Sequence, residues 1–226
     1  AMRGSLNIRD FEQLRNYFWQ QVIISPDLCA MYFANSQGEL TGYNCIHSQE
    51  TVELLSKRGL KNLSVGTPVS MESRKPDLGK RKFSLVDRQG KPRQLIYTQS
   101  IDYQASAWYP YAKASRKQIW SPITVYRIFP ILGIFAIAPV HDAAGNFQGA
   151  FVSDVKLSDL STYLNKLHFS PSGQSFIIDR RGNLVATSRL ETLLSVQPKK
   201  HPQPLPAVNS KDTWTRAIAQ QLLNRF

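Results

Sequence analysis

Four short stretches of the chain share one alternation of apolar and polar residues. In each, a β-prone apolar segment leads into a polar turn with Asn or Asp two or three residues before Gly, and a second β-prone segment follows. Glycine adopts the positive φ that such hairpin turns require, and the Asx side chain bonds to the turn backbone. The pattern predicts four hairpins and an antiparallel sheet. The turn glycines are Gly38, Gly90, Gly145 and Gly182.

Apolar residues recur at helical spacing in three other segments. Residues 7–24 carry such a stripe up to the Ser-Pro pair at 25–26, and residues 154–168 carry a second one built from leucines. Residues 212–226 form a third amphipathic segment, with Trp214, Ile218 and Leu222 on one face. The order helix, sheet, helix and hairpin predicts an α+β fold.

Two further segments affect the interpretation of the fold. The apolar run at 128–140 is shorter than the about 20 residues that a membrane helix needs, so it predicts a buried strand. The proline-rich run at 198–206 predicts a loop or a polyproline stretch.

The formal net charge of +12 is the most unusual feature of the composition. Much of the excess lies between residues 57 and 93 and includes Lys80, Arg81 and Lys82. Clustered Lys and Arg neutralise phosphates in nucleic-acid-binding proteins, but they also form solvated faces or surfaces near anionic lipid. The run contains Pro and Gly and no helical periodicity, so it offers no recognition helix. We therefore expect a solvated face.

The sequence carries no catalytic motif. Its 4 histidines are isolated from one another, and no nucleophile elbow, phosphate-binding loop or metal-ligand spacing occurs. We therefore expect no catalytic activity, no bound metal and no cofactor. Cys29 and Cys45 flank the first hairpin, whose pairing allows either a disulfide or two buried thiols.

The stretch AWYPYAKASRKQIWSP at 107–122 gathers aromatic side chains in a basic, polar context. It contains the Trp108-Tyr109 pair and a Trp-Ser-Pro at 120–122, and it is followed by Gly145, Gly149, Asp154 and a Gly-Gln-Ser-Phe-Ile-Ile-Asp at 173–179. In this order and spacing the chain resembles the double Cache family, the PAS-like extracytoplasmic sensor domains of bacterial transmembrane receptors.

The resemblance implies a long N-terminal helix packed on a PAS-like antiparallel sheet, followed by a second module. Residues 1–25 correspond to a stalk helix and 26–154 to the membrane-distal ligand-binding module. Residues 155–168 correspond to a connecting helix, and 169–226 to a membrane-proximal module that is expected to be incomplete.

In the family, the Trp-Tyr pair opens a short helix that lines the ligand cavity. Trp108 and Tyr109 would then be pocket walls, although all the aromatic residues, Tyr111 and Trp120 in particular, also fit a plain core role. Asp154 corresponds to the carboxylate that holds a ligand ammonium, and it could equally cap the helix that follows. The ligand-binding residues expected from the resemblance are Trp108, Tyr109, Asp154, Tyr111, Thr124 and Ser106.

One departure from the family bears on the ligand. Amino-acid-binding members place arginines before the Trp-Tyr pair to hold a carboxylate, whereas this chain has Gln104 and Ser106 there, and Thr124 where a tyrosine often stands. Neither Gln nor Ser replaces a bidentate Arg fork. A small polar or cationic ligand is therefore expected.

The resemblance thus implies a periplasmic sensor domain of a histidine kinase or nucleotide cyclase receptor. Its partners would be a small ligand, the membrane through flanking spans outside this chain, and a second copy in a homodimer, with no nucleic acid. Two alternatives stay open: a basic nucleic-acid-binding module, which the charge and aromatics would suit, and a ligandless Cache-like domain that only dimerises.

Overall fold

The computed structural model describes residues 6–25, 30–46, 48–125, 132–167, 173–189, 191–195 and 203–223. The chain forms two compact units. Unit 1 contains Ala1–Ser121 and Phe135–Asp154, and unit 2 contains Pro122–Ile134 and Val155–Phe226.

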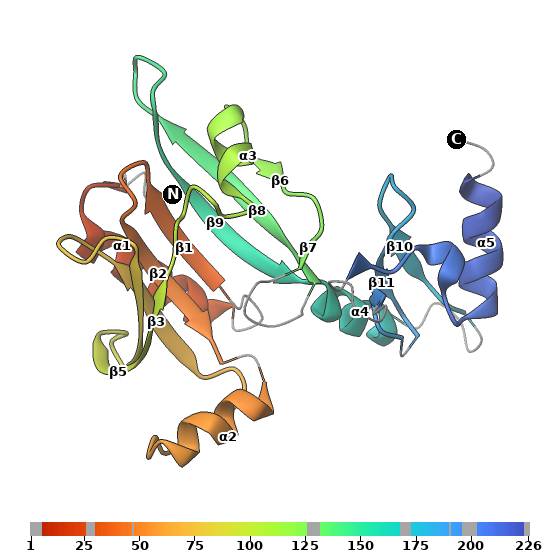
Figure 1. Cartoon of the computed structure of the whole chain (residues 1–226), viewed down its shortest axis with the longest axis horizontal. Helices are drawn as coiled ribbons and strands as arrows, with labels where there is room; N and C mark the ends of the chain where they lie inside the picture. The colour runs from red at the N-terminus through yellow and green to blue at the C-terminus, as the bar shows by residue number, and fades with distance from the viewer. Residues whose placement is uncertain are drawn as a thin grey trace. The chain divides into compact units, whose positions relative to one another are not determined.

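The main sheet has the strand order β5-β4-β3-β2-β1-β9-β8-β6, and most of it belongs to unit 1 (Figure 1). Strand β7 and the first residues of β8, with which it pairs, belong to unit 2. Every pairing whose register is defined is antiparallel, as the sequence predicted. The strands are β1 (Ala30–Asn35), β2 (Leu40–Cys45), β3 (Pro68–Ser73), β4 (Lys80–Val86), β5 (Pro92–Ser100), β6 (Ile119–Trp120), β7 (Thr124–Val125), β8 (Leu132–His141) and β9 (Phe147–Lys156).

The four predicted hairpin turns are confirmed and share one geometry. In each turn the glycine N–H donates to the carbonyl of the Asn or Asp three residues earlier, at 2.9 to 3.2 Å. Gly38, Gly90, Gly145 and Gly182 have φ of +89°, +77°, +85° and +79°. An L-residue pays for this left-handed conformation, which explains why glycine occupies every one of these positions.

Helix α1 (Phe11–Ile24) covers one face of the sheet (Figure 1). Leu14 and Phe18 are fully buried against Phe33 of β1 and Tyr43 of β2. The helix begins four residues later than its apolar pattern predicted. Asp10 is the reason, because its side chain accepts the N–H groups of Glu12 and Gln13 and so fixes the N-terminus there.

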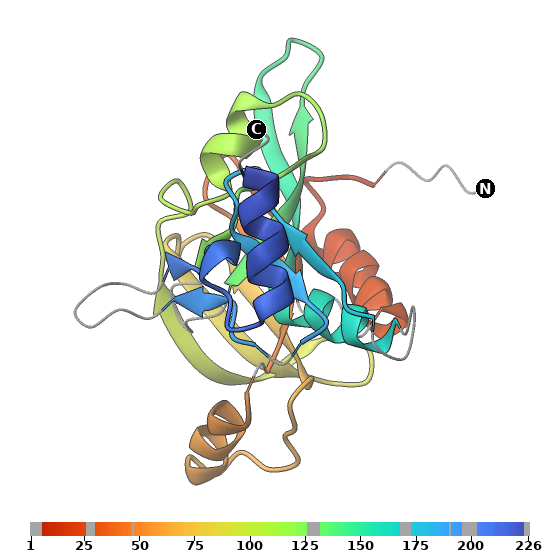
Figure 2. The same cartoon turned by 90° about the vertical axis from the view of Figure 1, so that its right-hand side faces the viewer.

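Two shorter helices complete unit 1. Helix α2 (Gln49–Lys57) connects β2 to β3 and lies beyond the ends of these strands in both views (Figures 1 and 2). Helix α3 (Tyr109–Ala114) begins directly after Trp108, as the family resemblance implied. It carries Tyr109 and Ala112 into the interior of the unit.

Unit 2 is smaller and has its own core. Helix α4 (Leu157–Lys166) packs over the hairpin of β10 (Phe176–Ile178) and β11 (Leu184–Thr187), and its Leu157 joins Leu132, Leu184 and Ala219 in one cluster. The remaining elements are β12 (Leu194–Ser195), β13 (Gln203–Pro204), the 3-10 helix η1 (Ala207–Asn209) and α5 (Thr213–Leu223).

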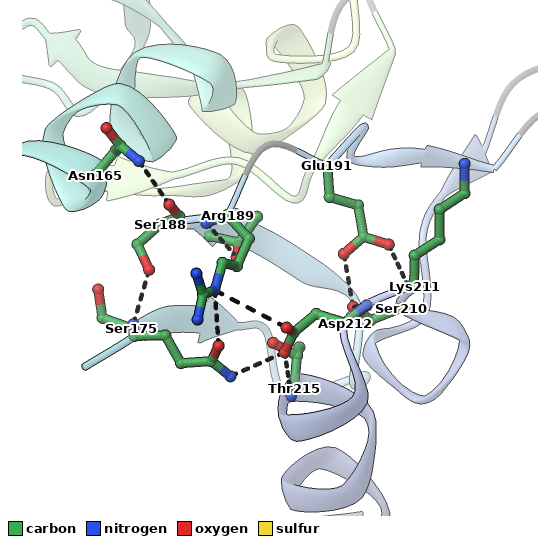
Figure 3. A network of polar contacts seen from close by, with 11 residues as sticks. Asn165, Ser175, Ser188, Arg189, Glu191, Ser210, Lys211, Asp212 and Thr215 are labelled. Carbon is green, nitrogen blue, oxygen red and sulfur yellow. Dashed lines mark hydrogen bonds and ion pairs between the residues drawn. The ribbon is translucent and has the colours of Figure 1, made fainter. Parts of the chain in front are cut away.

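A polar network anchors α5 in unit 2 (Figure 3). The Glu191 carboxylate accepts the Ser210 hydroxyl at 2.6 Å and the Lys211 N–H at 2.5 Å. Asp212 accepts the Thr215 N–H at 2.7 Å, which caps the helix, and the Gln174 amide at 2.8 Å. These bonds hold the start of α5 against the loops that follow β11 and precede β10.

Three expectations need correction. The helix expected at 154–168 is Leu157–Lys166, because Asp154 and the two residues after it continue β9. The apolar face expected on α5 is wrong: Trp214 is 68% exposed and Ile218 39%, whereas Thr215 and Ala219 are buried. Part of the proline-rich run forms β13, while residues 198–202, like Cys29 of the possible disulfide, lie outside the described residues.

Candidate functional site

The sheet of unit 1 has two chemically different faces. Side chains alternate along a strand, and Phe33 points toward α1, so its neighbours Tyr32 and Ala34 point to the opposite face. Directly paired residues share a face, which assigns Gly42 of β2 and Val152 of β9 to the same side as Tyr32. We call this side, opposite α1, the distal face.

Trp108 lies over the distal face. Its ring centroid is 6.1 Å from that of Tyr32 in an edge-on arrangement, and the side chain is 2% exposed. Tyr109 contacts it at 5.6 Å and also meets Phe147 of β9 edge-on at 5.8 Å. Trp108 and Tyr109 are therefore brought together, next to α3, and both are buried.

Asp154 lies on the same face. It pairs with Ala30, two residues before Tyr32 along β1, and residues two apart in a strand point to one side. The alternative that it caps the following helix is wrong, because the residue at the N-cap of α4 is Lys156. The half-buried Asp154 thus pairs with a position two residues before Tyr32 on β1, the residue that contacts Trp108.

The remaining predicted residues lie in different surroundings. Tyr111 is 42% exposed on α3, and half-buried Ser106 lies in the turn before that helix, where its carbonyl accepts the Tyr109 N–H. Thr124 belongs to β7 in unit 2, and its hydroxyl donates to the Pro122 carbonyl at 3.2 Å. Trp120 is 59% exposed, so a plain core role for it is wrong.

Neighbouring residues of the basic run on β4 point to opposite faces of the sheet. Lys80 and Lys82 of β4 are exposed, as expected for a solvated face, and Lys82 pairs with Asp77 at 2.7 Å. Arg81, between them, points the other way and is half-buried under Tyr103, with its guanidinium 5.1 Å from the ring centroid. The expectation of a solvated face is wrong for this one residue. The signal that could have revealed it is the apolar Phe83 two residues later, because residues two apart in a strand share a face and Phe83 is buried.

A pocket of about 210 Å³ opens in unit 1 beside this tyrosine. It lies between the first hairpin turn and the segment after β5. That volume is below the roughly 300–1,000 Å³ of typical ligand sites, so it suits a small polar molecule or water. The lining residues are Ser36, Gln37, Gly38, Gly79, Ile101, Asp102, Tyr103 and Gln104.

Clusters of metal-ligating side chains and helices of membrane-spanning length are both absent from the described residues. No group of three or more His, Cys, Asp or Glu side chains there is arranged to hold a metal ion. Within the same residues, no helix has the length and apolar character needed to cross a membrane.

Comparison with known proteins gives matches of structure and none of sequence. No family model matches the chain, and no curated protein does. The extracellular domain of mmHK1S-Z3, a candidate histidine kinase, aligns with a TM-score of 0.52 at 13% identity, over 97% of this chain and 68% of that one. The corresponding domain of mmHK1S-Z2 gives 0.50 and 12%, over 97% and 70%.

A third structure is the ligand-binding domain of the Campylobacter jejuni chemoreceptor Tlp3 in complex with 4-methylisoleucine. It aligns with a TM-score of 0.45 at 13% identity, over 81% of this chain. The chain spans 56% of the length of that domain. The two histidine kinase matches establish the α+β fold, with a helix on a large antiparallel sheet, that the double Cache resemblance implied.

Proposed function

We propose that this chain is the extracytoplasmic sensor domain of a membrane-bound signalling protein and binds a small molecule on the distal face of unit 1. The observation that carries the proposal is the placement of Trp108 and Asp154. They come from segments 46 residues apart and lie over neighbouring positions of one sheet face, opposite the helix that closes the other. The fold shared with extracellular domains of histidine kinases supports it.

The proposed site combines an aromatic wall with one carboxylate. Trp108 offers a π-face and Tyr109 a ring with a hydroxyl, the amphipathic surfaces that ligand pockets commonly use. Asp154 supplies the negative charge that a ligand ammonium requires. A cationic or neutral polar ligand fits these groups, with Ser106 and Tyr111 as further candidate contacts in unit 1, whereas Thr124 belongs to unit 2 and is not part of the proposed site.

Signalling would follow from a ligand that binds two states of the domain with different affinity. In the proposal, the domain dimerises in its receptor, and flanking spans outside this chain carry the change across the membrane. The module boundaries at 25, 154 and 168 belong to the same proposal. The histidine kinase domains with this fold support a kinase output, and a nucleotide cyclase output is the alternative.

A thermal-shift screen of small amines, amino acids and neutral polar compounds tests the proposal. A ligand at a hundredfold excess over its Kd stabilises the folded protein by about 2.7 kcal/mol, which raises Tm by several degrees. The expected result is a shift with at least one amine that Asp154→Asn abolishes. Asp77→Asn, which removes a carboxylate of unit 1 whose side chain is 42% exposed, is the matched control and should leave the shift intact.

Sedimentation and gel retardation, combined with the thermal-shift screen, separate the two alternative functions. A ligandless dimerisation domain would show no shift with any compound while sedimenting as a dimer. A nucleic-acid-binding module would retard an oligonucleotide at low salt and release it as salt rises, because counterion release drives such binding.

A further inference from the structure

Arg81 lies in a polar cluster on the distal face that the proposed site does not use. On β4, Arg81 shares a face with Phe83, which is 2% exposed and stacks on Tyr97 at 4.4 Å. The guanidinium lies over the ring of Tyr103, and its Nε donates to the Tyr103 hydroxyl at 3.5 Å. Tyr103 itself is 4% exposed. The arginine is therefore held between the sheet and an aromatic cover.

Two neighbouring polar side chains have buried atoms without a hydrogen-bond partner. Gln99 of β5 pairs directly with Arg81, and its Oε1 is buried and unbonded. On the other side, Glu72 pairs with Lys82, so the next residue of β3, Ser73, shares the face of Arg81. Ser73 is 1% exposed, and its hydroxyl is buried and unbonded.

The charge of Arg81 also has no acidic partner in the described part of the chain. Among the described residues, no carboxylate forms an ion pair with it within 4.0 Å. Desolvating a cation and a hydroxyl costs free energy unless both are satisfied, and the ring of Tyr103 compensates the cation only in part. This combination is the one that an anionic ligand group would complete.

We propose that Arg81, Ser73, Gln99 and Tyr103 form a subsite for the carboxylate of a small organic acid. The planar guanidinium matches a carboxylate with two parallel N–H···O bonds, and the Ser73 hydroxyl donates a third. Gln99, whose amide orientation is interchangeable, can offer its NH₂ to the carboxylate or its oxygen to a ligand hydroxyl. The pocket that borders Tyr103 lies next to this subsite.

The subsite goes beyond the proposed function and is separable from it. Three strands, β1, β2 and β3, lie between Asp154 on β9 and Arg81 on β4. Four interstrand spacings of about 4.8 Å place the two side chains on the order of 19 Å apart across the sheet, too far for one small amino acid to bridge.

Isothermal titration with acetate, succinate and glutarate tests the subsite, with inorganic phosphate as a separate arm. We expect at least one carboxylate to bind wild type, and Arg81→Gln to weaken it by about tenfold or more, since the charge-assisted bonds are lost. Ser73→Ala should weaken it severalfold. Arg81→Lys keeps the charge without the fork, so it should fold normally and bind with intermediate affinity.

Two matched controls make the result specific. Lys82→Gln removes a neighbouring charge from the opposite face and should bind the carboxylate like wild type, and so should Asp154→Asn. Three results would overturn the subsite: no binding of any carboxylate, equal binding by wild type and Arg81→Gln, or a loss in Lys82→Gln as large as in Arg81→Gln. Binding of phosphate alone would refute the carboxylate assignment, and loss of carboxylate binding in Asp154→Asn would refute a separate subsite.

Discussion

Two arginines on opposite faces of the same sheet have different surroundings. Arg15 of α1, whose side chain is 19% exposed, lies 3.5 Å from Glu12 and 3.4 Å from Glu72. Arg81 on the distal face has an aromatic ring and unbonded polar atoms around it, and no ion pair among the described residues. Arg15 is thus paired with carboxylates inside the protein, although its Nε is buried without a hydrogen-bond partner among the described residues. We propose that a ligand carboxylate takes the corresponding place beside Arg81.

The aromatic residues of the two faces also differ in their contacts. On the α1 face, Phe33 meets Phe151 at 5.0 Å and Tyr43 donates its hydroxyl to the Gly90 carbonyl at 2.6 Å, so the polar end of the ring is bonded within the protein. On the distal face, Trp108 meets Tyr32 of β1 edge-on, Asp154 lies on the neighbouring strand β9, and Arg81 lies farther along the sheet on β4. The α1 face thus contributes packing to stability, and we propose that the distal face serves ligand recognition.

The largest expected effect comes from the α1 face. Phe18→Ala removes a fully buried ring that packs on Phe151 at 5.9 Å, and should lower the free energy of unfolding by about 3–5 kcal/mol. Urea denaturation measures it. Ligand affinity, measured at a temperature where the variant is folded, should stay within twofold of wild type. A parallel loss of affinity would mean that the two faces are not independent.

The second prediction compares the loss of stability caused by alanine substitution in two turns. In Gly90→Ala, the added Cβ would lie 2.4 Å from the Trp19 ring, whereas at Gly38 it would meet nothing within 4 Å. Both glycines have positive φ, so Gly38→Ala should cost only the conformational penalty of about 1–2 kcal/mol. Gly90→Ala should cost clearly more in thermal unfolding. Equal losses would show that Trp19 moves aside freely.

A smaller effect concerns Asp212 and pH. Burial opposes its ionisation, but hydrogen bonds from Thr215 and Gln174 and the charge of Arg189 outweigh burial, so its pKa lies below the ordinary value of 3.8. The stabilisation is therefore complete above that value and is lost as pH falls through the lower folded pKa. Asp212→Asn keeps the cap and should flatten this acid dependence of unfolding. An unchanged pH profile would remove Asp212 as a contributor.

The smallest effect is expected from the exposed side of β4. Replacing Lys80 and Lys82 together with Gln should leave Tm and ligand binding unchanged, because surface substitutions usually cost less than about 0.5 kcal/mol. Differential scanning calorimetry and titration check it. A marked loss of ligand affinity would place these lysines, and not only Arg81, in a binding surface.

The sequence predicted the fold from local signals that act within a few residues. The four turns depend on one Asx and one Gly each, and their geometry is the one expected. The end of β9 was harder, because pairing with Ala30, more than a hundred residues away, keeps Asp154 in the strand, although the predicted helix began at that residue. Helix propensity within 154–168 could not reveal this pairing.

The residues of the distal face could also be predicted only in part from the sequence. The resemblance identified Trp108, Tyr109 and Asp154 as candidate contacts, but Arg81 was hidden in a run of three basic residues. The apolar Phe83, two residues later, is the one sequence signal that sets Arg81 apart from the two lysines, and the register of β4 between β3 and β5 then places its side chain on the distal face. The exposure of Trp214 likewise depends on which side of α5 meets the core of unit 2, and Thr215 and Ala219 decide it.

The most direct test of the account is calorimetric titration of amines and amino acids into wild type, Asp154→Asn and Asp77→Asn. We predict that wild type binds at least one amine or neutral polar ligand and that Asp77→Asn binds the same ligand equally. Asp154→Asn should bind it with an affinity lower by about tenfold or more. Tight amino-acid binding that Asp154→Asn leaves unchanged would contradict both the ligand class and the role of Asp154 on the distal face.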